Sequence, residues 1–410
     1  MKETIESIRK EPLPINKGTS DLGISAMVRN RLANSLLLLG SIVCCLVVAE
    51  GATRFFLGDS IVLFPRYVTE ADYDGVRLRR LIPNSTFWHT SIDGSWQFRV
   101  NGQGFRDDED YDFSKPLGRR RVLVLGDSHT QGFEARQEAI FPKVLERRLR
   151  TRGVDAQVLN TGISGFGTAE QLMFLEHEGM KYHPDAVVLA FFANDFDDSA
   201  KSGLYELING KLLVRKTNHT PGVKAIALMN AVPTASWLSQ NSYLFSLLVN
   251  AVWEAAKKAL SVAARKQLIT EYAISPSQMD DYQRDLVVAL LGRMKAVAHA
   301  ADIPFIVVEI PFVDLTERVA WVPSVAPDLV PAFIANCDLF LPASSYLGDA
   351  QKGTVHVPHG QRHISEQTHA RIAEALDRIL GETDNRFRSA RHPASAVVVP
   401  GARTPLELPF

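Results

Sequence analysis

The chain has only three cysteines among its 410 residues. Cys44 and Cys45 are adjacent within an apolar run, which leaves Cys337 alone in the remainder. No internal disulfide framework can therefore form there, and no cysteine spacing is typical of a zinc site. An excess of charge of one sign is also missing, because the formal net charge is −1. No overall field therefore favours nucleic acid as a partner. Internal repeats are absent as well.

One long apolar run lies near the N-terminus. Residues 32–49 carry no charge and lie between Arg31 and Glu50. At a rise of about 1.5 Å per residue, such a helix spans roughly 27 Å, just enough for the hydrocarbon core of a bilayer. A buried helix and a cleaved signal peptide are the alternatives, but the leader is long and no small-x-small cleavage site follows. Arg29 and Arg31 favour an N-terminus inside the cell, so we expect a single-pass inner-membrane anchor with the rest of the chain on the periplasmic side.

From Arg119 onward the chain alternates strands and helices. Apolar and β-branched runs predict buried strands at 122–125, 158–160, 186–192 and 305–310, and residues 96–100 alternate as a half-buried strand before them. Helical spacing of apolar residues predicts helices between these strands, and a last helix that Ser365 caps. Alternating βα units imply a mostly parallel sheet covered on both faces, which is an α/β/α architecture.

We expect five segments along the chain: a flexible cytoplasmic tail at 1–31, a transmembrane helix at 32–50, a lead-in with β structure at 51–118, the main domain at 119–382 and a disordered tail at 383–410. The lead-in is short for an independent domain, so we expect it to pack on the main one. An insertion at about 200–285 contains a predicted long helix at 242–267. This insertion either covers the site as a cap or adds packing to the core.

Polar residues stand at the ends of the predicted strands. Gly126-Asp127-Ser128 follows the first strand, Asn160-Thr-Gly-Ile-Ser-Gly-Phe-Gly167 follows the second, and Phe192-Ala-Asn-Asp195 follows the third. His363 precedes the last helix. Ligands of open α/β sheets bind beyond the carboxyl ends of the strands. Ser128 is therefore positioned to be a nucleophile, which needs a base to take its proton and donors to stabilise an oxyanion.

This set of residues resembles the GDSL, or SGNH, hydrolase family over about residues 95–382. Gly126-Asp127-Ser128 is similar to the family's nucleophile block, and Gly165 and Asn194 are similar to its oxyanion-binding glycine and asparagine. His363 is similar to the catalytic histidine, and His369 to the second histidine in the following helix. The resemblance implies a flavodoxin-like α/β/α fold. It also implies an esterase in which Ser128 attacks an acyl carbonyl while His363 takes its proton.

The implied oxyanion hole consists of the backbone N–H groups of Ser128 and Gly165 and the side-chain amide of Asn194. Asp127 is expected to be structural and to bond within the turn. His129 is expected to point away from the site, although some acyl-transferring relatives carry a histidine there. The anchor and the segment Asn101–Arg106 are also similar to those of membrane-anchored bacterial members of the family.

The region before the histidine departs from the family's pattern. An aspartate usually stands two or three residues before this histidine and orients its imidazole, but this chain has Gln361 and Gly360 there. His363 is therefore oriented by a backbone carbonyl or by an acid from elsewhere, with Asp349 and Glu366 as candidates.

Two further positions bear on the site. The third block begins with Phe192 where the family usually has glycine. His356 and His359 precede His363 in a loop with Pro and Gly, but their spacing fixes no metal geometry, so no metal and no cofactor are predicted.

Three functions remain open. The first is an ester hydrolase that removes acetyl or similar groups from a cell-envelope carbohydrate or lipid. The second is an O-acyltransferase that works with a membrane acyl-donor protein through the same acyl-serine. The third is a binding or scaffolding module with an inactive site, which the missing aspartate keeps open as an alternative.

Overall fold

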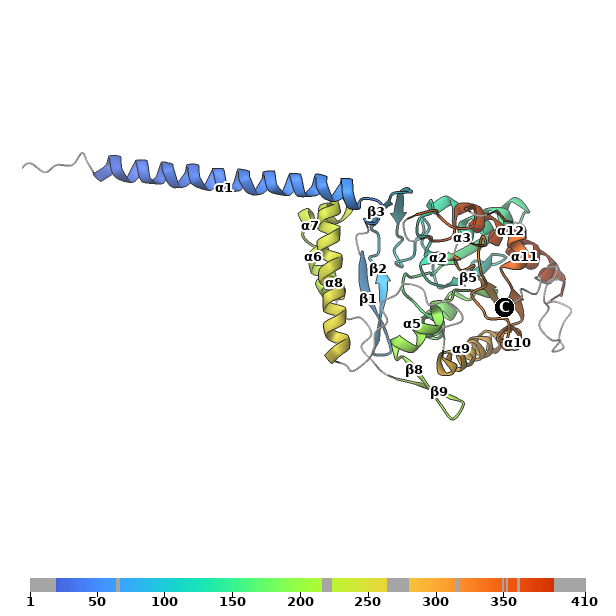
Figure 1. The fold of residues 1–410 in the computed structure, drawn as a ribbon. Helices are drawn as coiled ribbons and strands as arrows, with labels where there is room; N and C mark the ends of the chain where they lie inside the picture. Colours follow the sequence, from blue (N-terminus) through green and yellow to red (C-terminus); the bar gives the residue numbers. More distant parts are fainter. Residues whose placement is uncertain are drawn as a thin grey trace, which may run out of the picture. The chain divides into compact units, whose positions relative to one another are not determined.

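The computed structural model describes most of the chain (Figure 1), namely residues 20–63, 67–215, 223–263, 280–314, 318–348, 350–351, 353–359 and 362–386. The chain divides into two compact units, residues 1–56 and 57–410. The second unit contains the central sheet and all the proposed site residues.

The first unit consists of the helix α1 (Ser20–Leu57) as far as residue 56. Within it, Val28–Leu57 is long and apolar enough to cross a membrane, judged by length and composition alone. The expectation of a flexible tail up to residue 31 is wrong for residues 20–31, which are helical. Adding a residue to an existing helix costs far less than starting one, so the helix extends beyond the apolar run at both ends. The rest of the predicted tail, residues 1–19, lies outside the described residues.

Five parallel strands form the central sheet of the second unit, in the order β11-β10-β7-β5-β6. They are β5 (Arg120–Leu125), β6 (Ala156–Asn160), β7 (Ala186–Phe191), β10 (Phe305–Glu309) and β11 (Leu339–Leu341). The first four confirm the predicted strands. Three residues are too few to show a period, so β11 escaped prediction. From β5 the chain goes first to β6 on one side and then to β7 on the other side. The carboxyl ends of β5 and β7 therefore form the topological switch point of a flavodoxin-like sheet.

Helices cover both faces of this sheet, as predicted (Figure 1). On one face, α3 (Phe141–Thr151) and α12 (Glu366–Arg386) bury Leu145 and Ile372 against Val122 and Val158. On the other face, α4 (Thr168–His177) and α9 (Asp281–Ala300) pack against the alternate strand residues, such as Leu123. Both faces of each strand are thus buried, which explains the continuous apolar runs in the sequence. The predicted cap of the last helix is confirmed, because the Thr368 N–H donates to Ser365 Oγ at 3.2 Å.

The lead-in folds as two antiparallel hairpins, which are formed by β1 (Val68–Tyr73) with β2 (Val76–Leu81) and by β3 (Thr86–Ser91) with β4 (Gly94–Arg99). The predicted strand at 96–100 corresponds to β4. Asp74 and Gly75 connect the first hairpin with positive φ angles of 54° and 85°, as a two-residue turn of this kind requires. Phe87 and Phe98 belong to the same buried cluster as Leu123 of β5, so the lead-in shares the core of the main domain.

The described part of the insertion contains a third hairpin and three helices. They are β8 (Tyr205–Ile208), β9 (Lys211–Val214), α6 (Val223–Asn230), α7 (Pro233–Asn241) and α8 (Tyr243–Ala263). The helix α8 accounts for most of the predicted one at 242–267, whose last residues lie outside the described ones. The helix α6 contacts β1 and α7 contacts β3, where the Trp88 N–H donates to Gln240 Oε1 at 3.0 Å. This arrangement favours added packing over a cap.

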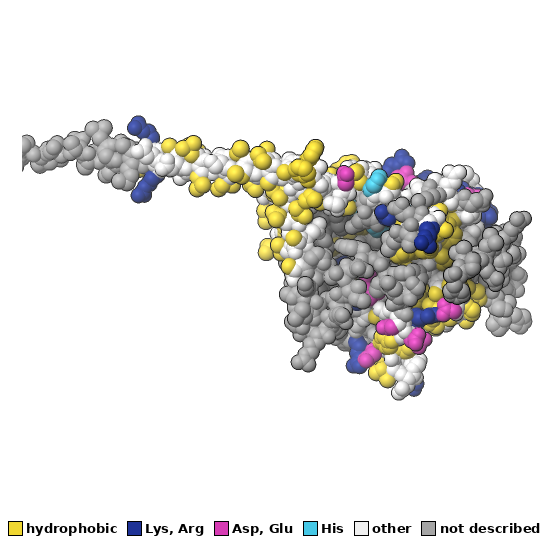
Figure 2. All heavy atoms as spheres, viewed as in Figure 1, with side chains coloured by type: hydrophobic (Ala, Val, Ile, Leu, Met, Phe, Trp, Pro, Cys, Tyr) yellow, Lys and Arg dark blue, Asp and Glu magenta, His cyan; other side chains and the backbone are white. Residues whose placement is uncertain are grey.

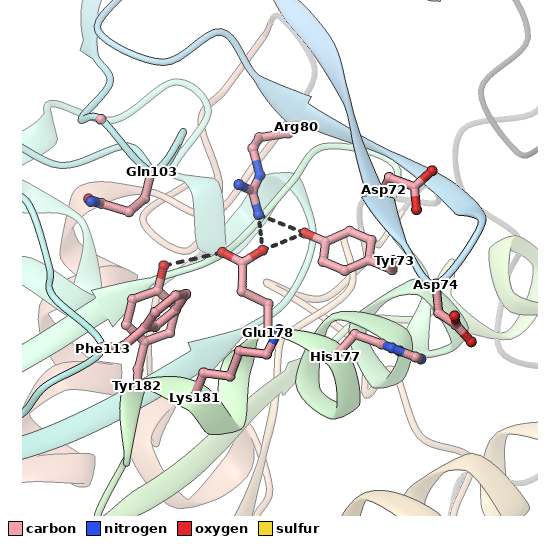
Figure 3. A pocket seen from close by; sticks show the side chains of 11 residues that line it. Asp72, Tyr73, Asp74, Arg80, Gln103, Phe113, His177, Glu178, Lys181 and Tyr182 are labelled. Carbon is pink, nitrogen blue, oxygen red and sulfur yellow. Dashed lines mark hydrogen bonds and ion pairs between the residues drawn. The ribbon is translucent and has the colours of Figure 1, made fainter.

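A hollow of about 480 Å³ lies between the β1–β2 hairpin and the C-terminal end of α4 (Figure 3). Glu178 stands in its wall and accepts hydrogen bonds from the Tyr73 hydroxyl at 3.0 Å, the Tyr182 hydroxyl at 3.2 Å and the Arg80 guanidinium. These bonds attach the hairpin to the helix. The Gly165 loop precedes the opposite end of α4, so the hollow lies away from the proposed chemistry.

Candidate active site

The nucleophile turn begins where β5 ends. The Asp127 carboxylate accepts a hydrogen bond of 2.8 Å from the His129 N–H and so caps the short helix α2 (Ser128–Gln131). Gly126 has no room for a side chain, since a Cβ there would lie 2.0 Å from Thr130 Oγ1. Gly132 ends α2 at a φ of 85°, a conformation that glycine adopts without strain. The turn therefore holds Ser128 at the carboxyl end of β5.

Ser128 and His363 meet across the site. His363 Nε2 lies 2.9 Å from Ser128 Oγ, although the two residues are 235 positions apart in the chain. The side chain of His363 is only 9% exposed. Its loop is fixed by a backbone hydrogen bond of 2.8 Å from the Val357 N–H to the His363 carbonyl. The predicted nucleophile and base are thus within proton-transfer distance.

The acid behind His363 is Glu134, which sequence reasoning did not consider. Glu134 Oε2 lies 3.3 Å from His363 Nδ1 and also accepts a hydrogen bond of 3.2 Å from the His363 backbone N–H. The expectation for Glu366 is wrong, because its carboxylate binds the guanidinium and the backbone N–H of Arg136 instead. Asp349, the other candidate, lies outside the described residues.

The backbone at Glu134 explains how its side chain reaches the site. Its φ is 58°, an uncommon conformation for a residue other than glycine, and such strain persists only where the surroundings enforce it. Arg106 supplies that support, since its guanidinium donates to the carbonyls of Gln131 at 3.1 Å, Ala135 at 2.8 Å and Gly132. Burial lowers the pKa of Arg106 to about 9, so it is still charged at neutral pH.

The tautomer of His363 follows from these contacts. The Glu134 side chain is fully buried, so a carboxylate there needs donors. With Nδ1–H donating to Glu134, Nε2 carries the lone pair that faces the Ser128 hydroxyl. This is the order of groups that a serine nucleophile requires.

The second loop places Gly165 beside the nucleophile turn. The Ser164 N–H donates to Gln131 Oε1 at 2.8 Å, which ties this loop to α2. Gly165 has a φ of 75°, and Arg79 of β2 holds its carbonyl through an Nη2–O hydrogen bond of 2.8 Å. Within the described part of the chain, neither the Gly165 nor the Ser128 N–H donates to a protein acceptor. Both are therefore available to an oxyanion.

Asn194 stands at the carboxyl end of β7, where it precedes α5 (Asp195–Ser202). Its Nδ2 donates to Asp198 Oδ2 at 3.0 Å, which fixes the amide and leaves its second N–H. Burial raises the pKa of Asp127, while the hydrogen bond from the His129 N–H lowers it. Because β5 and β7 are neighbouring parallel strands, Asn194 and the nucleophile turn follow strand ends at the same edge of the sheet, where the third oxyanion donor is expected.

The expectation that His129 points away from the site is wrong. Its ring lies 4.8 Å from that of His363 and 4.1 Å from that of Phe192, measured between centroids. The Ile364 N–H donates to its Nδ1 at 3.3 Å, so α2 and the His363 loop meet through this side chain. Burial lowers the pKa of His129 well below its ordinary value, and the ring stays neutral beside the base. Phe192, which replaces the family's glycine, provides the wall against which the ring packs.

The two other histidines of the loop have separate partners. His356 Nε2 lies 3.0 Å from the Pro311 carbonyl, and His359 Nδ1 lies 2.8 Å from Asp93 Oδ1. Among the residues that the structure describes, no three side chains of metal-binding type are grouped.

The fold is a parallel α/β sheet with a serine, a histidine and a carboxylate in line at its switch point, the arrangement of a serine hydrolase. The model of the GDSL-like lipase/acylhydrolase family matches residues 124–329. The chain belongs to this family.

Comparisons with individual proteins are more distant. An arylesterase of Vibrio mimicus is 36% identical over 75 residues, which are 18% of this chain and 38% of that protein. Among solved structures, TesA shares 14% identity over 64% of this chain and 99% of its own, with a TM-score of 0.34. EstA, a psychrotrophic esterase from Pseudoalteromonas sp., shares 12% over 65% of this chain and 99% of its own, with a TM-score of 0.33. Such structural likeness is too low to carry an argument about substrate.

Proposed function

We propose that this protein is a serine esterase that cleaves O-acyl esters through an acyl-serine. The observation that carries the proposal is the line from Glu134 through His363 to Ser128, in which the nucleophile lies 2.9 Å from its base. Membership of the GDSL-like lipase/acylhydrolase family supports the same reaction class.

In the first half-reaction, Ser128 Oγ forms a bond to the acyl carbon while its proton moves to His363 Nε2. The carbonyl π electrons move onto the oxygen, which the N–H groups of Ser128 and Gly165 and the Asn194 amide stabilise. One such donor typically contributes about 3 kcal/mol to lowering the barrier. Glu134 stabilises the imidazolium that forms. The bond to the alcohol then breaks, and the leaving alkoxide takes the proton from Nε2.

In the second half-reaction, water takes the place of the alcohol. Nε2 accepts a proton from the water as its oxygen bonds to the acyl carbon. The second tetrahedral intermediate collapses, Ser128 recovers its proton, and a carboxylic acid leaves. An acceptor hydroxyl in place of this water would give acyl transfer through the same residues.

We assign the substrate to acylated carbohydrate or lipid of the cell envelope. The support is the candidate span Val28–Leu57, which would hold the site beside such substrates with the body outside the cytoplasm. A reporter that is active only in the cytoplasm, fused to the C-terminus, should be inactive. Activity of that reporter would refute this orientation.

The test of the reaction uses the full chain in detergent with p-nitrophenyl acetate. We expect hydrolysis and covalent labelling by a fluorophosphonate, both lost in Ser128→Ala and both retained in Ser60→Ala, which changes an exposed serine. Absence of both hydrolysis and labelling in the wild-type chain would exclude an enzymatic function and leave the binding module as the remaining alternative. Acyl transfer to an added glycan that exceeds hydrolysis would replace the esterase by an acyltransferase.

A further inference from the structure

The helices of the insertion present an apolar face to solvent. Five large hydrophobic side chains on α6, α7 and α8 and in the link between α6 and α7 are 47% to 73% exposed, and Figure 2 shows hydrophobic side chains gathered over these helices. We call the following residues the insertion face: Leu228, Val232, Trp237, Leu248 and Val252. Single exposed apolar residues are ordinary, but a contiguous set on adjoining helices indicates an interaction surface.

The charge of this segment restricts what can cover it. Between Val223 and Val252 the only charged residue is Lys224, and neither Asp nor Glu occurs. Protein surfaces that face water normally mix both signs of charge. A helical surface with a single basic residue, no acidic residue and an exposed tryptophan is suited to the interfacial zone of a bilayer, where aromatic side chains concentrate.

The covalent path from the candidate span leads to the same helices. The span ends at Leu57, six residues before Leu63. Leu63 exchanges two backbone hydrogen bonds of 2.7 and 2.9 Å with Thr90 of β3, and Trp88 of the same strand bonds to Gln240 of α7. Six residues reach at most about 20 Å. The strand on which α7 packs is therefore connected to the end of the span through a segment of only six residues.

We propose that the insertion face lies on the surface of the membrane that Val28–Leu57 crosses. The proposal rests on that crossing and is independent of the esterase reaction. Because the face is tethered to the bilayer, its binding is intramolecular, and a modest apolar surface is sufficient. Contact at both the span and the insertion would fix the orientation of the body and hold its site at a constant distance from the bilayer.

The experiment uses the full chain in vesicles of phosphatidylcholine and phosphatidylglycerol with brominated acyl chains, which quench a nearby fluorophore. Cys44 and Cys45 are replaced by Ala, and a fluorophore is attached after Trp237→Cys. Leu46→Cys in the span is the positive control. Leu117→Cys is the negative control, because Leu117 is a fully exposed apolar residue in the loop before β5. Thermal unfolding, followed by circular dichroism, verifies the fold of each variant.

We expect quenching after Trp237→Cys to approach that after Leu46→Cys and to exceed that after Leu117→Cys. If the Trp237 and Leu117 positions are quenched equally weakly while the Leu46 position is quenched, the insertion face lies elsewhere and the proposal is wrong. Lack of quenching at the Leu46 position would overturn the anchor, and the proposal with it, without touching the esterase assignment. Val252→Cys repeats the measurement on α8 should Trp237→Cys prevent folding.

Discussion

Replacing Glu134 by Gln tests the part of the site that the family's pattern does not supply. The change keeps the size of the side chain and removes its charge. In the wild-type chain one oxygen, Oε2, receives both the Nδ1–H and the backbone N–H of His363. A glutamine can still accept one of these bonds, but it cannot stabilise an imidazolium by charge. If its NH₂ group turns toward Nδ1, the imidazole adopts the tautomer that cannot act as base toward Ser128.

The magnitude follows from these two effects. A hydrogen bond to a charged group contributes about 1.5–3 kcal/mol, so loss of the charge alone lowers the rate by about 10- to 150-fold. A reversed tautomer costs more, and the corresponding Asp-to-Asn substitution in a serine-protease triad lowers kcat about 10⁴-fold. We therefore expect kcat of Glu134→Gln to fall about 10²- to 10⁴-fold. KM should change little, because Glu134 is fully buried behind the imidazole.

Initial rates of p-nitrophenyl acetate hydrolysis and the rate of fluorophosphonate labelling measure this loss, with thermal unfolding as the check on folding. Glu366→Gln is the matched control, because Glu366 binds Arg136, whose side chain is 71% exposed, and exposed pairs contribute at most about 1 kcal/mol. Its activity should equal that of the wild-type chain. The reasoning fails if Glu134→Gln stays within about threefold of wild type, a barrier change of only about 0.7 kcal/mol.

Three further substitutions test the surroundings of the triad. Asn194→Ala should lower kcat about 10²- to 10³-fold, measured by steady-state hydrolysis, and an unchanged kcat would exclude its amide from the oxyanion hole. Arg106→Met leaves buried carbonyls of the Glu134 turn without donors, at about 1–3 kcal/mol each; denaturant unfolding should show this loss, and unaltered stability would refute the bracing role. Burial raises the pKa of Asp198 to about 8 from an ordinary 3.8, so its contribution to stability is present below pH 4 and is lost as pH rises through 8. Asp198→Asn should flatten the free energy of unfolding against pH in this window, by at most about 1.4 kcal/mol per pH unit, and an unchanged profile would contradict the assignment.

The fold was largely predictable because its signals are local. The strands β5, β6, β7 and β10 are buried on both faces, so each is a continuous apolar run that stands out from its neighbours. Ser365 marks the start of α12 through ordinary helix-cap chemistry. By contrast, β11 has three residues, too few for any period. The packing of α6 and α7 on the lead-in hairpins was one of two alternatives, since an apolar helix face does not specify what covers it.

The site residues also divide into those that the sequence predicted and those that it did not. Ser128, Gly165 and Asn194 follow strand ends, and the carboxyl ends of parallel strands meet at one edge of a sheet, so their positions could be inferred from the order of elements. Glu134 carried one weak signal, an acid two residues after the glycine that ends a one-turn helix. The predicted candidates for this acid, Asp349 and Glu366, both lie near His363 in the sequence, so Glu134 was not among them.

The amino-acid sequence alone determined four of the five strands of the sheet, the positions of Ser128, Gly165 and Asn194 after strand ends, and the position of His363 before the last helix, because each depends on short-range periodicity or capping. Only the tertiary structure decided which acid serves His363 and on which side His129 lies. Glu134 reaches the imidazole through a backbone conformation with φ of 58°, held by the guanidinium of Arg106 from the lead-in. Such a contact between distant segments leaves no local pattern in the sequence.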